Sequence, residues 1–241
     1  MKIIRHGESY SSQKASQFGK GIERSQIIIA LIIASYLVFF AFFWSAQRYW
    51  SLVLISVVWF FLFTKFNKNH QWMRWQFGGF QRGTEGEEEV MRRLGTRLDD
   101  SFTYIANYMN PAACSGDIDG IVIGPKGVFL LEIKNWRGRF RASGLDFYRH
   151  RGGKMYELYN SPVVQAQANM EKLGKYFQER GVQVPVRSFV VMTDGYIESF
   201  NGNTGVFIAD SQKVTNEILG GANRMNPEQI QKVIAVLGSN S

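Results

Sequence analysis

The sequence predicts an α/β protein in which a mixed central sheet is flanked by helices and preceded by a two-helix transmembrane hairpin. Two long uncharged hydrophobic runs lie close to the N-terminus. After residue 80, helix signals and strand signals alternate, which is typical of a sheet covered by helices. A length of 241 residues allows one medium-sized domain plus a smaller part.

The two hydrophobic runs predict the hairpin. Residues 27–46 carry no charge and are long enough to cross the ~30 Å hydrocarbon core as a helix. Residues 49–64 are also uncharged but form a shorter run, which tilting and local thinning of the bilayer can accommodate. We therefore expect two spanning helices, at 27–46 and 49–64, in contact with the lipid bilayer. The alternatives are one span plus a re-entrant or interfacial segment, or a buried hairpin in a soluble protein.

The charge distribution predicts the orientation of this hairpin. Residues 1–80 hold nine Lys or Arg against two Asp or Glu, whereas residues 81–241 hold nineteen against eighteen. The basic residues lie on both sides of the hydrophobic pair: Lys2, Arg5, Lys14, Lys20 and Arg24 before it, and Lys65, Lys68 and Arg74 after it. The positive-inside rule then keeps both flanks in the cytoplasm. We expect a multi-pass protein of the cell inner membrane with its soluble domain in the cytoplasm.

The remaining boundaries follow from composition. We expect a basic cytoplasmic segment at 1–26, a juxtamembrane linker rich in aromatic residues at 65–80, and a soluble domain at 81–241. The single cysteine, Cys114, excludes a disulfide framework and fits a reducing compartment.

Local signals predict the elements of the soluble domain. A capping box at Thr84–Glu87 predicts the start of a helix that ends near residue 98. The continuous apolar run at 186–192 is typical of a buried strand. The other predicted strands are 102–107, a hairpin over 118–134, 139–141, 147–150, 155–159 and 205–209, and the other predicted helices are 161–180, 211–219 and 227–237.

The hairpin over 118–134 contains the most informative residues. If Ile123 pairs with Val128 across the turn, Asp119 falls opposite Glu132, and Lys134 lies one pleat further along on the same face. Like charges directly opposed at roughly 5 Å destabilise a sheet, but a divalent cation would neutralise them. This arrangement predicts a metal-dependent phosphodiesterase. Taken alone, Glu132 and Lys134 are equally explained as a surface charge pair on an edge strand.

A basic segment follows these residues. It holds seven Lys or Arg against one acidic residue between positions 134 and 154, interleaved with aromatic residues. Basic side chains beside aromatic ones suit contact with a nucleic-acid backbone and its bases. We therefore expect a phosphate groove, and the alternative is a solvated outer face of a hairpin. The candidate nucleic-acid-binding residues are Arg137, Arg139, Arg141, Arg149, Arg151 and Lys154.

Four stretches, taken together, resemble a known family. They are Gly83–Glu87, Gly116–Phe129, Leu131–Gly138 and Asn160–Gln165. In this order they resemble the NERD (nuclease-related) domain, which is assigned to the PD-(D/E)XK restriction-endonuclease-like superfamily. The resemblance covers residues 81–195. It implies a restriction-endonuclease-like fold, with a four-stranded mixed core sheet flanked by helices and a Mg²⁺-dependent site for phosphodiester hydrolysis.

The resemblance also implies roles for individual residues. Asp119 matches the metal-binding aspartate, and Glu132 and Lys134 match the Glu-x-Lys pair with its catalytic lysine. Glu87 matches an acidic residue on the first helix, and Gln165 matches the glutamine that opens the later helix. Two positions depart from the family pattern: Gly120 replaces a usual histidine, and Ser161 interrupts a usual Asn-Pro dipeptide.

The expected chemistry is that of a hard cation bound by oxygen atoms. Asp119, Glu132 and the backbone carbonyl of Ile133 could supply three oxygen ligands to Mg²⁺, with Mn²⁺ as an alternative metal. The metal would polarise the phosphate and lower the pKa of the attacking water. Lys134 would orient or deprotonate that water and stabilise the developing charge, with Gln165 helping to position the nucleophile or the lysine.

These observations predict a membrane-anchored, metal-dependent nuclease whose substrate is DNA, with RNA as the second choice. The alternative is a catalytically inactive, membrane-anchored nucleic-acid-binding or scaffold module. A further alternative is a sensor or assembly protein whose hairpin forms homo-oligomers in the lipid. Bound divalent metal would separate the nuclease from the last of these.

Overall fold

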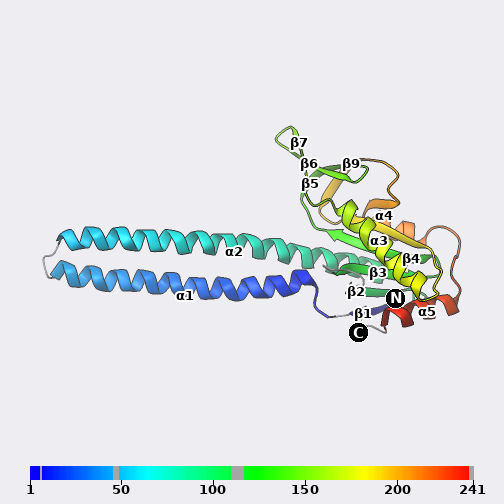
Figure 1. Cartoon of the computed structure of the whole chain (residues 1–241), viewed down its shortest axis with the longest axis horizontal. Helices are drawn as coiled ribbons and strands as arrows, with labels where there is room; N and C mark the ends of the chain where they lie inside the picture. The colour runs from blue at the N-terminus through cyan, green and yellow to red at the C-terminus, as the bar shows by residue number, and fades with distance from the viewer. Residues whose placement is uncertain (6, 46–48, 110–116, 239–241) are drawn as a thin grey trace. The chain divides into compact units, whose positions relative to one another are not determined.

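A computed structural model describes residues 1–5, 7–45, 49–109 and 117–238 (Figure 1). The chain divides into two compact units. One consists of residues 1–10 and 82–241, and the other of residues 11–81. Helix α2 (Tyr49–Arg97) is continuous and contributes residues to both units.

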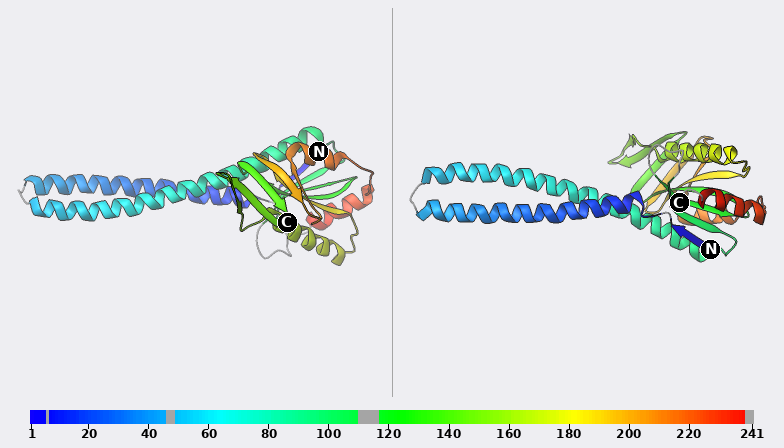
Figure 2. Two further views of the ribbon diagram at one scale, coloured as in Figure 1. Left: turned by 90° about the horizontal axis from the view of Figure 1, so that it is seen from above. Right: turned by 60° about the horizontal axis from the view of Figure 1, so that its bottom comes forward.

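The helical unit is built from α1 (Tyr10–Ser45) and the first part of α2, which lie side by side (Figures 1 and 2). Both helices are long and apolar enough to cross a membrane. Large apolar side chains such as Phe42, Trp50 and Phe61 are mostly exposed. Apolar surface of this extent marks an interaction site or a membrane contact rather than the core of a soluble protein.

Polar contacts join the two helices within the apolar region. The Trp59 indole N–H donates to the Ile32 carbonyl at 2.9 Å and lies 3.1 Å from the Ser35 hydroxyl oxygen. Nearer the other end of the unit, the Ser25 hydroxyl lies 2.7 Å from Nδ1 of His70, and both side chains are buried. Such interhelical hydrogen bonds help to fix the register of the two helices.

The predicted helix start at Thr84–Glu87 is wrong. The capping box lies inside α2, and the segment expected to be a linker, residues 65–80, is helical as well. Extending an existing helix costs less free energy than nucleating a new one, and interior N–H groups already have carbonyl partners. A capping sequence therefore need not mark a boundary when a helix reaches it from the N-terminal side.

A six-stranded mixed sheet forms the centre of the α/β unit, which confirms the predicted fold class. Its strand order is β1-β2-β3-β4-β8-β10. The strands are β1 (Lys2–Arg5), β2 (Thr103–Tyr108), β3 (Ile118–Gly124), β4 (Gly127–Lys134), β8 (Val186–Met192) and β10 (Val206–Asp210). Strands β2, β3 and β4 pair antiparallel, whereas β1 with β2, β4 with β8 and β8 with β10 pair parallel. The four strands β2, β3, β4 and β8 form the mixed core that the resemblance implied.

Helices cover both faces of this sheet (Figures 1 and 2). On one face, Val90 and Leu94 of α2, with Leu98 directly after that helix, join the core formed with β2, β3, β4 and β8. On the other face lie α3 (Pro162–Glu179) and α5 (Pro227–Gly238), with Leu173 and Val233 buried in a second cluster. Helix α4 (Ser211–Leu219) follows β10 and packs with the first cluster.

A second, four-stranded sheet carries the basic segment. Its order is β7-β6-β5-β9, with β5 (Gly138–Ser143), β6 (Asp146–Arg151), β7 (Lys154–Glu157) and β9 (Gly195–Asn201). Phe140 and Phe147 on its inner face are fully buried in a cluster that includes Val163 and Ala166 of α3. Ser161 caps that helix, because its hydroxyl accepts the Val163 N–H at 3.3 Å.

Strands β1 and β9 were not expected from the sequence. Residues 2–5 pair with β2 at the edge of the main sheet, so the α/β unit includes residues 1–10 in addition to the predicted 81–241. A four-residue strand separated from its partner by about a hundred positions leaves no local signal. Residues 2–5 form a strand because the edge of β2 is available for pairing.

The departure at Gly120 has a steric explanation. A Cβ atom on Gly120 would overlap the Tyr104 hydroxyl and lie 2.8 Å from its Cζ atom. Tyr104 is fully buried, so its ring fills the space that a side chain at position 120 would need. We predict that Gly120→Ala lowers the free energy of unfolding by about 1–3 kcal/mol, as overpacking of a core does. Chemical denaturation of the full chain would measure it.

Two variants test the cause. Gly174→Ala in α3 introduces the same methyl group where nothing lies within 4 Å, and it should leave stability unchanged or raise it slightly. Tyr104→Ala combined with Gly120→Ala should lose less stability than the sum of the two single changes. Simple additivity would contradict the steric explanation.

Candidate metal and nucleic-acid site

The hairpin of β3 and β4 has the predicted register. Ile123 pairs with Val128, and the pairing continues to Gly120 opposite Leu131. The next positions along the two strands are Asp119 and Glu132. The two acidic residues therefore lie where the two strands begin to separate.

The Asp119 carboxylate takes a backbone donor from β4. Its Oδ2 accepts the Ile133 N–H at 2.6 Å. The N–H and the carbonyl of one strand residue point to the same side, so the Ile133 carbonyl also faces β3. Two carboxylates and one backbone carbonyl thus belong to the same short stretch of the two strands.

Glu132 is the most unusual side chain of this site, because it is an acid that is only 2% exposed. Its Oε1 lies 2.5 Å from the Lys134 amine, while its Oε2 has no hydrogen-bond partner within the described part of the chain. Burial, and then the neighbouring Asp119, raise the pKa of Glu132 to about 8. A buried carboxylate oxygen without a partner is costly, and a cation would satisfy it.

Burial also raises the pKa of Asp119, to about 6, against the opposing effects of Lys134 and the Ile133 N–H. For Lys134, burial lowers the pKa, but the Glu132 and Asp119 carboxylates outweigh burial and hold that pKa above its ordinary value. Lys134 therefore stays protonated at neutral pH and presents a positive charge.

The donor set suits a hard divalent cation. Within the described ranges, no cluster of three or more His, Cys, Asp and Glu side chains could hold a metal ion. A site here would rest on Asp119 and Glu132 with the Ile133 carbonyl, and water would complete the coordination. Mg²⁺ binds in this way, through one or two carboxylates while keeping several waters.

Glu87 and Gln165 lie in different surroundings. Glu87 is half-buried on α2, and its charge acts on both Lys134 and Tyr104. Gln165 is exposed in the first turn of α3. It lines a cavity of about 400 Å³ together with Leu145 and Glu157, two residues of the second sheet and its turn.

The basic residues of the second sheet divide between its two faces. Arg149 pairs with Phe140 and therefore shares the inner face with the buried aromatic residues. Arg139 and Arg141 alternate with Phe140 and lie on the outer face, where Arg139 forms an ion pair with Glu198 at 3.2 Å. Arg151 lies two residues after Arg149 on β6, and Lys154 pairs with Arg151, so the side chains of both belong to the inner face. The predicted groove is therefore not one continuous surface of six cations.

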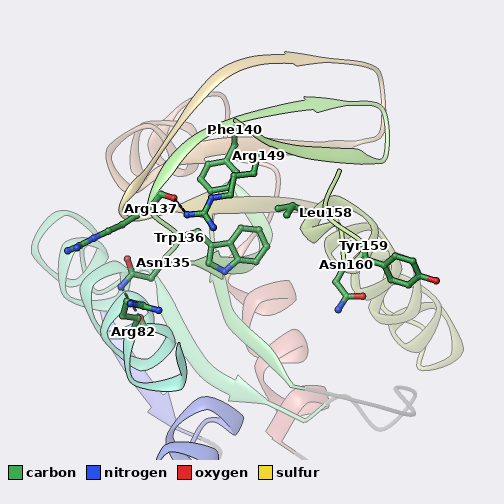
Figure 3. A pocket seen from close by; sticks show the side chains of 9 residues that line it. All are labelled: Arg82, Asn135, Trp136, Arg137, Phe140, Arg149, Leu158, Tyr159 and Asn160. Carbon is green, nitrogen blue, oxygen red and sulfur yellow. Dashed lines mark hydrogen bonds between the residues drawn. The ribbon is translucent and has the colours of Figure 1, made fainter. Parts of the chain in front are cut away.

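Figure 3 shows a cavity of about 510 Å³ whose lining includes Asn135 and Trp136, the two residues that follow Lys134 in the chain. The Lys134 amine lies 5.9 Å from the centroid of the Trp136 ring. The wall of this cavity combines cationic, aromatic and amide side chains. They are Arg82, Arg137 and Arg149, then Trp136, Phe140 and Tyr159, then Asn135 and Asn160, with Leu158. Trp136 projects between the two arginines on the second-sheet side and the loop that carries Tyr159 and Asn160.

A family model matches the larger part of this unit. The model of the nuclease-related domain (NERD) matches residues 82–193. The matched segment of the chain is similar to that domain. The match includes Asp119, Glu132, Lys134 and the whole wall of the cavity. Comparisons with curated proteins and with solved structures gave no match.

Sequence reasoning did not select five residues of this cavity: Arg82, Asn135, Leu158, Tyr159 and Asn160. Three of them lie in or directly beside stretches that carried the resemblance. Arg82 precedes Gly83–Glu87, Asn135 follows Lys134, and Asn160 opens the stretch that ends at Gln165. The fold brings them together, and the Asn135 amide donates to the Arg82 carbonyl at 2.8 Å.

The raised pKa of Glu132 predicts the pH dependence of stability of the metal-free protein. The folded state holds the Glu132 proton more tightly than the unfolded state does. The stabilisation that comes from this proton is therefore complete at acid pH and is lost as the pH rises through about 8. We predict that thermal unfolding in EDTA shows stability falling between about pH 4.5 and pH 8 and levelling off above pH 8, with this one group contributing at most about 1.4 kcal/mol per pH unit.

Glu132→Gln should remove most of this pH dependence and make the metal-free protein more stable at pH 9. The exposed Glu171→Gln serves as the control and should behave as the wild type does. Excess Mg²⁺ should raise the melting temperature of the wild type more at pH 8 than at pH 6, since the ion binds the deprotonated carboxylates. An unchanged pH profile for Glu132→Gln would contradict the assignment.

Proposed function

We propose that this protein is a membrane-anchored, metal-dependent nuclease that hydrolyses phosphodiester bonds in DNA. One observation carries the proposal. A buried glutamate, Glu132, stands beside Asp119 and the protonated Lys134 inside a segment similar to the nuclease-related domain. Burying two carboxylates next to each other is unfavourable unless a cation balances them.

Each group has a role in this proposal. Asp119, Glu132 and the Ile133 carbonyl hold Mg²⁺, or Mn²⁺ in its place, which when bound polarises the scissile phosphate and activates water. Lys134 keeps its proton and donates to the phosphate oxygens, where it stabilises the charge that develops during attack. Glu87 adds negative charge on the helix side of Lys134 and helps to keep that amine protonated.

The proposed anchor is the apolar part of the helical unit, at residues 27–64. The exposed apolar surface of α1 and α2 supports contact with lipid. The basic residues on both sides support an orientation with both ends in the cytoplasm, where the domain would meet cellular DNA. DNA is accordingly the substrate to test first, and RNA the second.

Cleavage assays on the full chain in detergent test the nuclease. We expect Mg²⁺ or Mn²⁺ to support cleavage of DNA and EDTA to abolish it. Asp119→Asn and Lys134→Met should each reduce the rate at least about 100-fold, as removal of one charge-stabilising group does. Glu171→Gln should retain wild-type activity, because its exposed carboxylate lies outside the site.

The outcomes separate the two principal functions. Full activity of both site variants would overturn the proposed site. If no metal supports cleavage of plasmid, linear or single-stranded DNA while the protein still binds DNA, the protein is the inactive binding module instead. Calorimetric titration with Mn²⁺ gives an independent measure of whether Asp119 and Glu132 hold metal.

Cysteine labelling tests the anchor. In a Cys114→Ser background, a membrane-impermeant maleimide added outside intact cells should label Gln47→Cys but not Gln81→Cys. Permeabilised cells should show labelling at both positions. Equal labelling of both in intact cells would contradict a cytoplasmic domain, and release of the protein from membranes by alkaline carbonate would contradict an integral anchor.

A further inference from the structure

The cavity beside Lys134 contains an indole that neighbouring rings hold in place. The ring centroid of Trp136 lies 5.9 Å from that of Phe140 and 6.2 Å from that of Phe147, at interplanar angles of 40° and 66°. Both phenylalanines are fully buried, whereas Trp136 is only half-buried. The core therefore supports Trp136 on one side and leaves part of the indole facing the cavity (Figure 3).

The indole stands next to the proposed cleavage site. The Lys134 amine lies 5.9 Å from the centroid of Trp136. A nucleotide stacked on Trp136 would therefore be an immediate neighbour of a phosphate held at Lys134, within the same strand.

Guanidinium groups line the same cavity as this indole. Arg149 donates to the Arg137 carbonyl at 2.8 Å and lies 5.8 Å from the centre of the Phe140 ring, so it is positioned from two sides. Arg82 is exposed on α2 at the opposite wall, next to Asn135 (Figure 3). Arginine suits phosphate binding because its planar group donates several hydrogen bonds at once.

We infer that this cavity receives one unpaired nucleotide of the substrate, with its base against Trp136 and its phosphate facing Arg149 and Arg82. A base inside a duplex is already stacked and must be extruded before an aromatic side chain can reach its face. The nuclease therefore acts on single-stranded nucleic acid in preference to duplex. Stacking tolerates any base, so little sequence preference is expected. The inference rests on the proposed function for the location of cleavage, but the binding it describes is measurable without cleavage.

Binding in EDTA tests the inference on the full chain in detergent. The probes are a fluorescein-labelled single-stranded DNA 12-mer, the same strand without its bases, and a blunt duplex of equal length. We expect the single strand to bind at least about tenfold more tightly than the duplex, and Trp136→Leu to bind it about tenfold more weakly than the wild type. The base-free strand should bind wild type and Trp136→Leu alike.

Matched variants separate stacking from a change of fold. Trp136→Phe retains an aromatic face and should recover most of the affinity. Tyr196 on β9 is an exposed aromatic residue that pairs with Arg139, so its side chain lies on the outer face. The variant Tyr196→Leu should therefore bind the single strand as the wild type does. Arg82→Ala changes an exposed helix residue without touching the core, and it should weaken binding of all single strands, with or without bases.

Three results would overturn the inference: equal affinity for duplex and single strand, unchanged affinity in Trp136→Leu, or unchanged affinity in Arg82→Ala. Cleavage of both DNA forms at equal rates by wild type and Trp136→Leu would also overturn it and would leave the nuclease intact. Conversely, single-strand binding that depends on Trp136, without cleavage under any condition, would support the cavity and overturn the proposed hydrolysis.

Discussion

The burial of Glu132 next to Asp119 is the constraint on which the candidate site depends. Moving a carboxylate out of water costs several kcal/mol unless a partner compensates. Lys134 compensates part of this cost at one oxygen, and the Ile133 N–H compensates Asp119. The remaining oxygen of Glu132 has no hydrogen-bond partner within the described ranges, which is the property expected of a group awaiting a cation.

The rest of the α/β unit holds these groups in place. Strand β4 is the centre of the sheet, antiparallel to β3 on one side and parallel to β8 on the other, so its backbone is fixed from both sides. Strands β3 and β4 stop pairing beyond Gly120 and Leu131, and the carboxylates of Asp119 and Glu132 lie just past that point. Tyr104 closes the adjacent space against Gly120 and keeps that part of the sheet dry.

The second sheet adds a different kind of surface. Its alternation of side chains places Phe140 and Arg149 on the inner face and Arg139 on the outer face. The inner face contributes to the core through Phe140 and Phe147 and to the cavity through Arg149 and Trp136 of the preceding loop. The same residues therefore stabilise the domain and shape the pocket near the candidate metal ligands, so we expect binding and stability to respond together to changes at Phe140.

The sequence by itself determined the hydrophobic helices, the mixed α/β fold and the register of the central hairpin, because each depends on local periodicity or on a two-residue turn. It also placed Asp119, Glu132 and Lys134 at adjacent positions. Only the tertiary structure decided that β1 joins the sheet, that α2 runs through the expected linker and cap, and that the basic residues of the second sheet lie on its two faces. It also assembled the cavity from Arg82, Trp136 and Asn160. These features depend on contacts between segments far apart in the chain, and such contacts leave no periodic signal in the sequence.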